Sequence, residues 1–454
     1  LKPRATLYPK YFSDLKSFST PRISSKLLQI TDSQSFIRSD LWRSGISNKI
    51  PSYPEAVFTS KIRQSIKDVE NNPSIENIQY LLETSDNDFK YVTDYANDLK
   101  LQLHGSDITF VVNRNINYTN ICSFKCNFCA FSKGRGHDDL RGKPYNISHE
   151  EIIRRTNEAI ERGATEVCLQ GGIHPQYSGE TYLDIVRAIR SASSSIHIHA
   201  FSPLEIDHGR KTLNISVKEF LVELKKAGLN SLPGTAAEIL HDEIRAIICP
   251  DKLTSKQWIN IIETSHSVGL PTTSTMMFGH VERNSHVAHH LLKLLNLQLK
   301  TNGITEFVPL PFVADEAPIF RRGQARPGPT FKETILVHSV ARILFQGQIN
   351  NIQGSWVKMG LAGLRFLLTS GINDIGGVLM NESITRSAGA SFGQELRLEE
   401  VIGIADELEL NLQQRNTLYD SLNNNLRDLI SLQSIPLIPI NNDYHQPKKL
   451  INIT

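Results

Sequence analysis

Cysteine, net charge and long apolar runs are all scarce in this sequence. Its 454 residues include five cysteines, an odd number that does not fit the paired framework of a small secreted disulfide protein. The 49 lysines and arginines nearly balance 47 aspartates and glutamates, so a formal charge of +2 gives no strong attraction to nucleic acid or anionic membranes. No uninterrupted apolar run approaches the roughly 18 residues of a membrane span. We therefore expect a protein of a reducing cytoplasm that acts on small molecules, without nucleic-acid or membrane partners.

The start of the chain, LKPRATLYPK, is basic and poor in acids, which weakly resembles an organelle transit peptide. The sequence has no initiator methionine and places Pro3 and Pro9 within its first nine residues. A truncated or excised segment fits these features at least as well as a targeting peptide does.

Short β-rich runs alternate with amphipathic helical stretches between residues 106 and 395. A charged helical lead-in precedes them over residues 55–105, with Gly105 as its expected stop. Eight runs predict strands, at 107–119, 165–172, 196–202, 229–234, 270–279, 304–311, 349–355 and 372–378. This alternation predicts an α/β fold, a (β/α)8 barrel of the TIM type. A doubly wound open sheet is the alternative. We expect residues 396–454 to form a C-terminal helix and a peripheral polar tail.

Polar residues alternate within several of the predicted strands. The clearest cases are Asn113, Asn115 and Asn117, then His197 and His199, then Asn351 and Gln353. A parallel sheet covered by helices on both faces would be continuously apolar, whereas a barrel with a reactive lumen needs polar side chains at every second position. The pattern favours a closed barrel.

Three of the five cysteines, Cys122, Cys126 and Cys129, stand within eight positions after the first predicted strand. In a (β/α)8 barrel this loop lies at the catalytic mouth. Four thiolates would saturate a structural zinc ion or a ferredoxin-type cluster, but three leave one iron of a [4Fe-4S] cluster open for a substrate. The non-enzymatic alternatives are an iron-sulfur electron carrier and a zinc-stabilised scaffold.

This spacing, with Phe128 directly before the last cysteine, resembles the radical S-adenosylmethionine (SAM) superfamily. The resemblance implies a [4Fe-4S] cluster held by the three cysteines and SAM chelated at the open iron. It also implies a one-electron donor, since the cluster must be reduced before SAM is cleaved.

Motifs along the barrel resemble one family in particular. LQGGIHP (169–175), SLPGTAAEIL (231–240), NIQGSWVKMG (351–360) and NDIGGVLMNESITRSAGAS (373–391) are similar to the 4-hydroxyphenyl transferase half of FO synthase. The resemblance implies transfer of the 4-hydroxybenzyl group of L-tyrosine to 5-amino-6-(D-ribitylamino)uracil, in biosynthesis of the deazaflavin FO. Radical SAM enzymes of futalosine-type menaquinone synthesis share several of these motifs and are the enzymatic alternative.

Residues 1–54 carry a second resemblance. ATLYPKYF (5–12) followed by LWRSG (41–45) resembles the end of the partner half of FO synthase, as in fused two-domain forms. The partner half is therefore an expected partner, fused or separate.

The resemblance and the barrel position together suggest further site residues, while the catalytic residues stay unassigned. The candidates for binding the cofactor are Gln170, Gly171, Gly172, His199 and Glu205. Each also has a purely structural explanation: a tight turn for the two glycines, lining of the lumen for His199, and an ordinary surface carboxylate for Glu205. The candidates for substrate binding are Asn351, Gln353, Asn381 and Glu382. Amides satisfied within a packed lumen are equally expected for these.

Overall fold

Parallel strands form a closed ring at the centre of the protein. The computed structural model describes residues 28–55, 60–132, 143–440 and 442. Its parallel strands are β1 (Asp107–Val111), β2 (Asn113–Asn117), β3 (Glu166–Gln170), β4 (His197–Ala200), β5 (Thr272–Phe278), β6 (Ile304–Pro311) and β7 (Asp374–Gly377). β2 pairs with β3, β3 with β4, β5 with β6, and β7 with β1.

Two short segments complete this ring of eight positions. Ser231 bridges to His199 of β4 and Leu232 to Thr272 of β5, while Ile352 bridges to Phe307 of β6 and Gln353 to Asp374 of β7, all in parallel. The (β/α)8 barrel is therefore confirmed. The strands expected at 229–234 and 349–355 are reduced to these bridges, and the first strand is interrupted between Val111 and Asn113.

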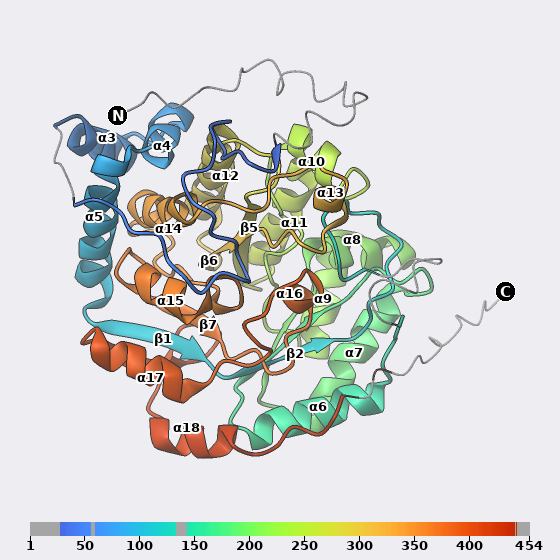
Figure 1. Ribbon diagram of the computed structural model, residues 1–454. Coiled ribbons are helices and arrows are strands. Elements are labelled where there is room, and N and C mark those ends of the chain that lie inside the picture. Colours follow the sequence, from blue (N-terminus) through green and yellow to red (C-terminus); the bar gives the residue numbers. More distant parts are fainter. Residues whose placement is uncertain (1–27, 56–59, 133–142, 441, 443–454) are drawn as a thin grey trace.

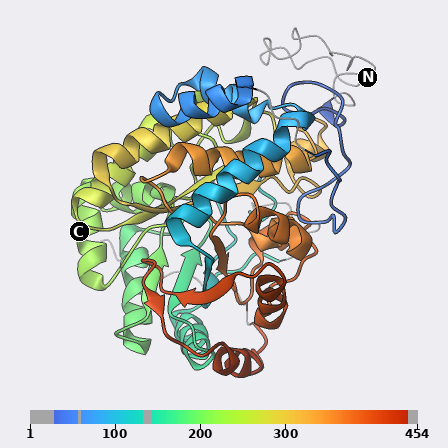
Figure 2. The same ribbon diagram turned by 90° about the vertical axis from the view of Figure 1, so that its left-hand side faces the viewer.

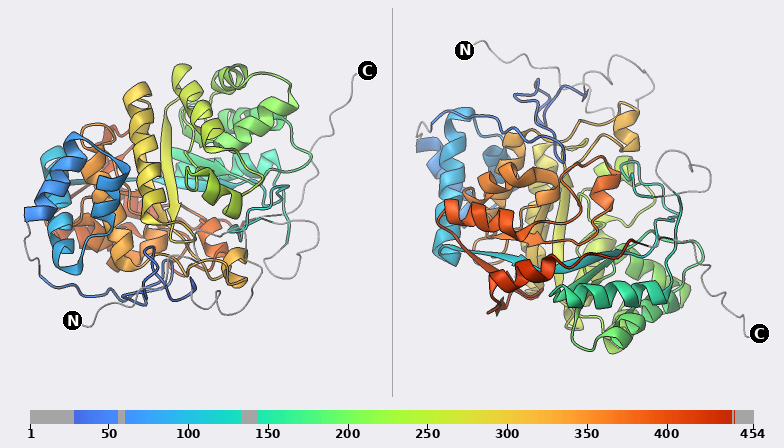
Figure 3. Two further views of the ribbon diagram at one scale, coloured as in Figure 1. Left: turned by 90° about the horizontal axis from the view of Figure 1, so that it is seen from above. Right: turned by 60° about the horizontal axis from the view of Figure 1, so that its bottom comes forward.

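Helices surround the ring on the outside (Figure 3). In chain order they are α6 (His149–Glu161), α7 (Gly179–Ala192), α8 (Pro203–Thr212), α9 (Val217–Ala227), α10 (Asp242–Ile248), α11 (Ser255–Ser267), α12 (Asn284–Thr301), α13 (Pro318–Arg321), α14 (Phe331–Phe345), α15 (Trp356–Leu368), α16 (Ile384–Ser387) and α17 (Leu398–Glu407). Many begin where a hydroxyl accepts a peptide N–H three residues on, as Ser148, Ser216, Thr254 and Thr330 do. Local sequence thus sets where these helices start.

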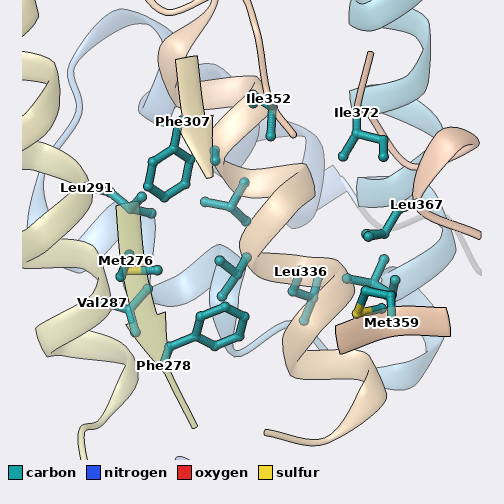
Figure 4. Close-up of a cluster of buried hydrophobic side chains, with 14 of the residues drawn as sticks. Met276, Phe278, Val287, Leu291, Phe307, Leu336, Ile352, Met359, Leu367 and Ile372 are labelled. Atoms are coloured by element: carbon teal, nitrogen blue, oxygen red, sulfur yellow. The ribbon is translucent and has the colours of Figure 1, made fainter. Parts of the chain in front are cut away.

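The apolar face of the strands packs under the helices. Figure 4 shows Met276 and Phe278 of β5, Phe307 of β6 and Ile352 meeting side chains of α12, α14 and α15. A second apolar cluster lies between β2–β4 and α6–α9 and includes Ile116 and Ile198. The residues that alternate with the polar ones are therefore the core of the protein, as the period-two pattern predicted.

The N-terminal segments cover one side of the barrel. α3 (Ser60–Asn71), α4 (Ile75–Leu82) and α5 (Asp86–His104) pack on α12 and α14 (Figure 2). Gly105, with φ 59°, ends α5 as expected. Residues 28–55 run back over the barrel, where Arg38 donates to the carbonyls of Gly328 and Pro329. Trp42 meets Phe331 edge to face at 5.4 Å. Of the two motifs suggesting a partner half, LWRSG lies in this segment and ATLYPKYF lies outside the described residues.

The expectation of a peripheral tail is wrong for residues 411–422. β8 (Asn411–Arg415) pairs in parallel with β1, from Asp107 opposite Asn411 to Phe110 opposite Gln414, and β9 (Ser421–Leu422) folds back on β8. α18 (Leu426–Gln433) follows, and Arg162 at the end of α6 pairs with Glu395 ahead of α17. Figures 1 and 3 show α17 and α18 beside α6, on the side of the barrel formed by β1 and β2.

A buried charge cluster closes the end of the barrel at which the strands begin, because Asp374 is the first residue of β7 and Glu306 lies near the start of β6. Arg415 contacts Asp374 through Nε at 2.5 Å and Nη2 at 3.0 Å, and Glu306 through Nη2 at 3.3 Å. Its guanidinium also lies 3.9 Å from the centre of the Tyr419 ring, whose hydroxyl donates to Glu306. Arg415, Asp374 and Glu306 are buried and Tyr419 is half-buried, so the tail supplies a floor to the lumen.

Among the described residues, no helix combines the length and the apolar character needed to cross a bilayer.

Candidate active site at the mouth of the barrel

The three clustered cysteines lie in the loop that follows β2, at the carboxyl end of the barrel strands (Figure 1). All three are partly exposed, and none of them is in a disulfide bond. The peptide N–H of Ile173 donates to Cys122 Sγ at 3.3 Å, and that of Ser132 donates to Cys129 Sγ at 3.4 Å. Such donors stabilise thiolates, and hydrogen bonds to the sulfurs tune iron-sulfur clusters. The loop therefore fits a cluster with three protein ligands.

Burial raises the pKa of the Cys122 thiol, and it raises that of Cys126 further. The neighbouring Cys129 adds to both increases, which places the three sulfurs within electrostatic reach of one another. Lys252 opposes the increase at both thiols. The raised pKa values favour the protonated thiols of Cys122 and Cys126, so binding a cluster would release their protons.

The cysteine loop is anchored to α10. The N–H of Asn127 donates to the Ile248 carbonyl at 2.8 Å, and its side-chain amide donates to the Ile247 carbonyl at 2.7 Å. Lys252 reaches back over the Phe128 ring, 5.2 Å from its centre, and pairs with Glu238 at 2.8 Å. Loop position thus depends on the end of α10 and the residues just after it.

A fourth thiol, that of Cys249, lies within electrostatic reach of the loop, because it contributes to the raised pKa of Cys126. It is 1% exposed and packs within the larger apolar cluster, directly after α10. The Cys249 side chain is thus part of the core, whereas the side chains of the three clustered cysteines are partly exposed to solvent.

Gly171 and Gly172 bring the end of β3 against the cysteine loop. A β-carbon on Gly171 would lie 2.3 Å from the Tyr118 ring, and one on Gly172 would lie 2.2 Å from the Ile121 carbonyl oxygen and 2.9 Å from Cys122 Cβ. The N–H of Gly172 also donates to the Thr119 carbonyl at 2.9 Å. Close packing against the cysteine loop explains both glycines, and their contact with a cofactor stays a prediction.

Glu205 is buried beside the same loops. Tyr118 donates its hydroxyl to Glu205 Oε1, while the N–H and hydroxyl of Ser202 donate to Oε2 at 2.7 and 2.5 Å. Burial raises the pKa of this carboxyl, against the hydrogen bonds that lower it. It is therefore not the surface carboxylate that was the structural alternative. Both oxygens have protein partners, so Glu205 ties together the loops after β2 and β4.

His199 lies deeper, toward the floor. Its Nδ1 lies 2.7 Å from Ser231 Oγ, and His197 Nε2 meets the same hydroxyl at 2.7 Å. Burial lowers the pKa of both histidines, while Glu166 opposes the decrease. This arrangement fits lumen lining. Gln170 ends β3 and its carbonyl accepts from Asn117 Nδ2 at 3.3 Å, nearer the mouth.

The four candidate substrate residues do not form one cluster of contacts. Asn351 is satisfied within the barrel wall, donating to the Thr305 carbonyl at 3.0 Å and accepting from Asn373 at 3.0 Å. Gln353 lies across Gly376, where a β-carbon would be 1.9 Å from its Nε2.

The other two candidates follow β7 at the mouth. Asn381 accepts from Arg114 at 2.7 Å. Glu382 accepts from the N–H groups of Thr385 and Arg386 at the start of α16, at 2.6 and 3.3 Å. Substrate contact stays a prediction for all four.

Two polar groups in the barrel were not predicted as site residues from the sequence. Lys358 is largely enclosed after the seventh strand position, and burial lowers its pKa to about 8. Its Nζ lies 3.5 Å from the Thr385 hydroxyl. Asn115 Oδ1 is buried in the lumen without a hydrogen-bond partner among the described residues. Such a group is costly unless a ligand or water satisfies it.

Two family profiles match the two halves of the barrel. The profile of the radical SAM superfamily matches residues 116–294, and that of the CofH/MqnC C-terminal region matches residues 301–426. The 5-amino-6-(D-ribitylamino)uracil--L-tyrosine 4-hydroxyphenyl transferase of Methanothermobacter thermautotrophicus is 44% identical over 361 residues, 80% of this chain and 97% of that protein. The FO synthase of Mycobacterium leprae is 44% identical over 369 residues, 81% of this chain and 42% of that protein. The chain thus spans less than half the length of the FO synthases it matches.

Solved structures show the same fold at low identity. The FeFe-hydrogenase maturase HydG from Carboxydothermus hydrogenoformans is 14% identical, with a TM-score of 0.59 over 79% of this chain and 80% of that one. Methylornithine synthase (PylB) is also 14% identical, with a TM-score of 0.59 over 81% of this chain and 99% of that one.

Proposed function

Because the chain belongs to the radical SAM superfamily, and within it to the 5-amino-6-(D-ribitylamino)uracil--L-tyrosine 4-hydroxyphenyl transferase family, we propose that it carries out that transfer. The 4-hydroxybenzyl group of L-tyrosine would leave its Cα and become bonded to carbon 5 of 5-amino-6-(D-ribitylamino)uracil. The observation that carries the proposal is a loop with three partly exposed cysteines at the mouth of a barrel that aligns with nearly the whole of such a transferase.

Enzymes of this superfamily use a [4Fe-4S] cluster and SAM, which when bound supply hydrogen-atom abstraction from the substrate. In this chain Cys122, Cys126 and Cys129 would hold the cluster. The Ile173 and Ser132 peptides would orient its sulfur ligands through their N–H groups. Gly171, Gly172 and Glu205 would line the adjacent cofactor site, since they pack directly against the same loop.

The polar lumen would hold the two substrates. The unsatisfied Asn115 oxygen and the amide of Gln353 suit a uracil ring, which presents both donors and acceptors. The Arg415 cluster closes the barrel below them and would keep water from entering at that end. Reactive chemistry would thus be confined to the mouth.

The proposal has consequences outside the chain. A one-electron donor must reduce the cluster, and the partner half of FO synthase, fused or separate, must consume the product. Three thiols that must bind iron require a reducing compartment, so we place the reaction in the cytoplasm.

A product assay tests the transfer directly. Anaerobically reconstituted protein receives a reductant, SAM, L-tyrosine and 5-amino-6-(D-ribitylamino)uracil, and the mass of the product is measured. We expect the coupled adduct, none with Cys126→Ser, and retained activity with Cys249→Ala as the matched control. SAM cleavage without adduct would refute the transferase assignment and favour a related enzyme such as those of futalosine-type menaquinone synthesis, with which the CofH/MqnC region is shared.

A further inference from the structure

Three metal-binding side chains meet outside the barrel, between α10 and α12. His241 directly precedes α10, Glu243 lies in its first turn, and His286 lies in the first turn of α12. One ligand atom from each lies within 4.8 Å of the other two. The rings of His241 and His286 are 4.5 Å apart between centres, and His289, on the same face of α12, is 5.3 Å from His241.

His241 has an unsatisfied nitrogen at this position. Its Nδ1 is buried and makes no hydrogen bond among the described residues. A buried polar atom without a partner costs on the order of 1–3 kcal/mol, and a bound metal ion would remove that cost. The arrangement therefore points to a ligand rather than to a satisfied structural histidine.

His286 shows what binding would change. Its Nδ1 accepts the N–H of Arg283 at 3.0 Å, in the capping interaction that starts α12. Ligation through Nδ1 would replace this bond, and ligation through Nε2 would need the proton on Nδ1. Metal binding therefore costs one capping bond in either case.

Charges on both helices surround the three residues. Glu243 and Asp242 on α10 and Glu282 before α12 are acidic, while Arg283 and Lys293 are basic. Burial lowers the pKa of His241 and His289 and lowers that of His286 to about 4. Their imidazoles are thus neutral near pH 7, the form that binds metals.

We propose that His241, Glu243 and His286 form a binding site for a divalent cation of the zinc type, with His289 or water as the fourth ligand. Imidazole and carboxylate ligands in a four-coordinate arrangement suit zinc. The ion would clamp the start of α10 to the start of α12.

This clamp would act on the cysteine loop through α10. The opposite end of α10 supplies the Ile247 and Ile248 carbonyls that receive both hydrogen bonds from Asn127, between Cys126 and Cys129. The site is separate from those cysteines, so its metal content can be measured independently of the proposed transfer.

Zinc titration of the anaerobic, cluster-loaded protein tests the site, because the cluster then occupies the three cysteines. We expect about one zinc ion per chain, with N and O scatterers at about 2.0–2.1 Å and no sulfur at about 2.3 Å in X-ray absorption. His241→Ala and His286→Ala should weaken binding at least about tenfold. His149→Ala, a histidine at the start of α6, is the matched control and should bind zinc as the wild type does.

A second variant distinguishes the loss of zinc binding from misfolding. Glu243 is exposed, so Glu243→Gln should leave the melting temperature without zinc unchanged and reduce the increase that zinc causes in the wild type. Sulfur scattering at the zinc, no saturable binding, or wild-type affinity in His241→Ala would each overturn the proposal.

Discussion

Replacing Arg415 with methionine would leave two buried carboxylates, Asp374 and Glu306, without the cation that now lies between them. Arg415 holds Asp374 through two nitrogens, at 2.5 and 3.0 Å, and reaches Glu306 at 3.3 Å. Its side chain is 4% exposed, and those of the two acids are 0% and 11% exposed, so water cannot replace the lost contacts. We therefore expect a large loss of stability from one residue of the tail.

The size of the loss follows from burial. Removing one partner of a buried ion pair costs about 3–5 kcal/mol, because the other charge stays desolvated. An unfolding entropy of about 2.1 cal/mol/K per residue gives about 0.95 kcal/mol/K for 454 residues. The melting temperature should then fall by about 3–5 °C if the barrel unfolds as one unit.

Calorimetry at pH 7.5 on wild type and variant measures this shift. Arg427→Met, at an exposed position of α18, is the matched control and should change the melting temperature by less than about 1 °C. Adding Asp374→Asn and Glu306→Gln to Arg415→Met should recover part of the loss, since no buried charge is then left unpaired. A melting temperature within 1 °C of wild type for Arg415→Met would refute the floor as a buried ion cluster.

Two further outcomes follow from the same structure. Burial raises the pKa of Glu306 to about 7, above its ordinary 4.5, so the folded state keeps a proton that the unfolded chain has released, and stability should fall as pH rises from 4.5 to 7. The loss is up to about 3 kcal/mol, and Glu306→Gln should show a flatter profile of melting temperature between pH 5 and 7.5; equal slopes would count against this cause. Gly172→Ala should displace the cysteine loop and lower the iron content, because its β-carbon would lie 2.2 Å from the Ile121 carbonyl oxygen, whereas Gly403→Ala meets nothing within 4 Å and should keep its iron. Full iron content in Gly172→Ala would show that the loop can move aside at no cost.

The barrel could be predicted because its signals are local. Each strand and helix has its own period, and the polar residues at 113, 115 and 117 or at 197 and 199 mark one face without reference to the rest of the chain. The cysteine loop is equally local, with all three thiols inside eight positions.

The floor and the proposed cation site could not be predicted because their residues are distant in sequence. On its own, NLQQR (411–415) resembles a polar tail. It becomes a strand because it pairs with β1, some 300 residues earlier in the sequence, and because Asp374 neutralises Arg415. His241 and His286 are likewise brought together by the packing of α10 and α12. The burial of Lys358 depends on the loop after β7, which its own helix does not reveal.

We propose that Cys122, Cys126 and Cys129 hold the cluster and leave one iron open to SAM. The most direct test of this claim is anaerobic iron and sulfide analysis, with SAM cleavage, on wild type, Cys122→Ser, Cys126→Ser, Cys129→Ser and Cys249→Ala. We predict about four irons and four sulfides per chain, with SAM cleavage, in wild type and Cys249→Ala, and loss of both in the other three. Loss of the cluster in Cys249→Ala would reveal a fourth protein ligand and contradict the claim.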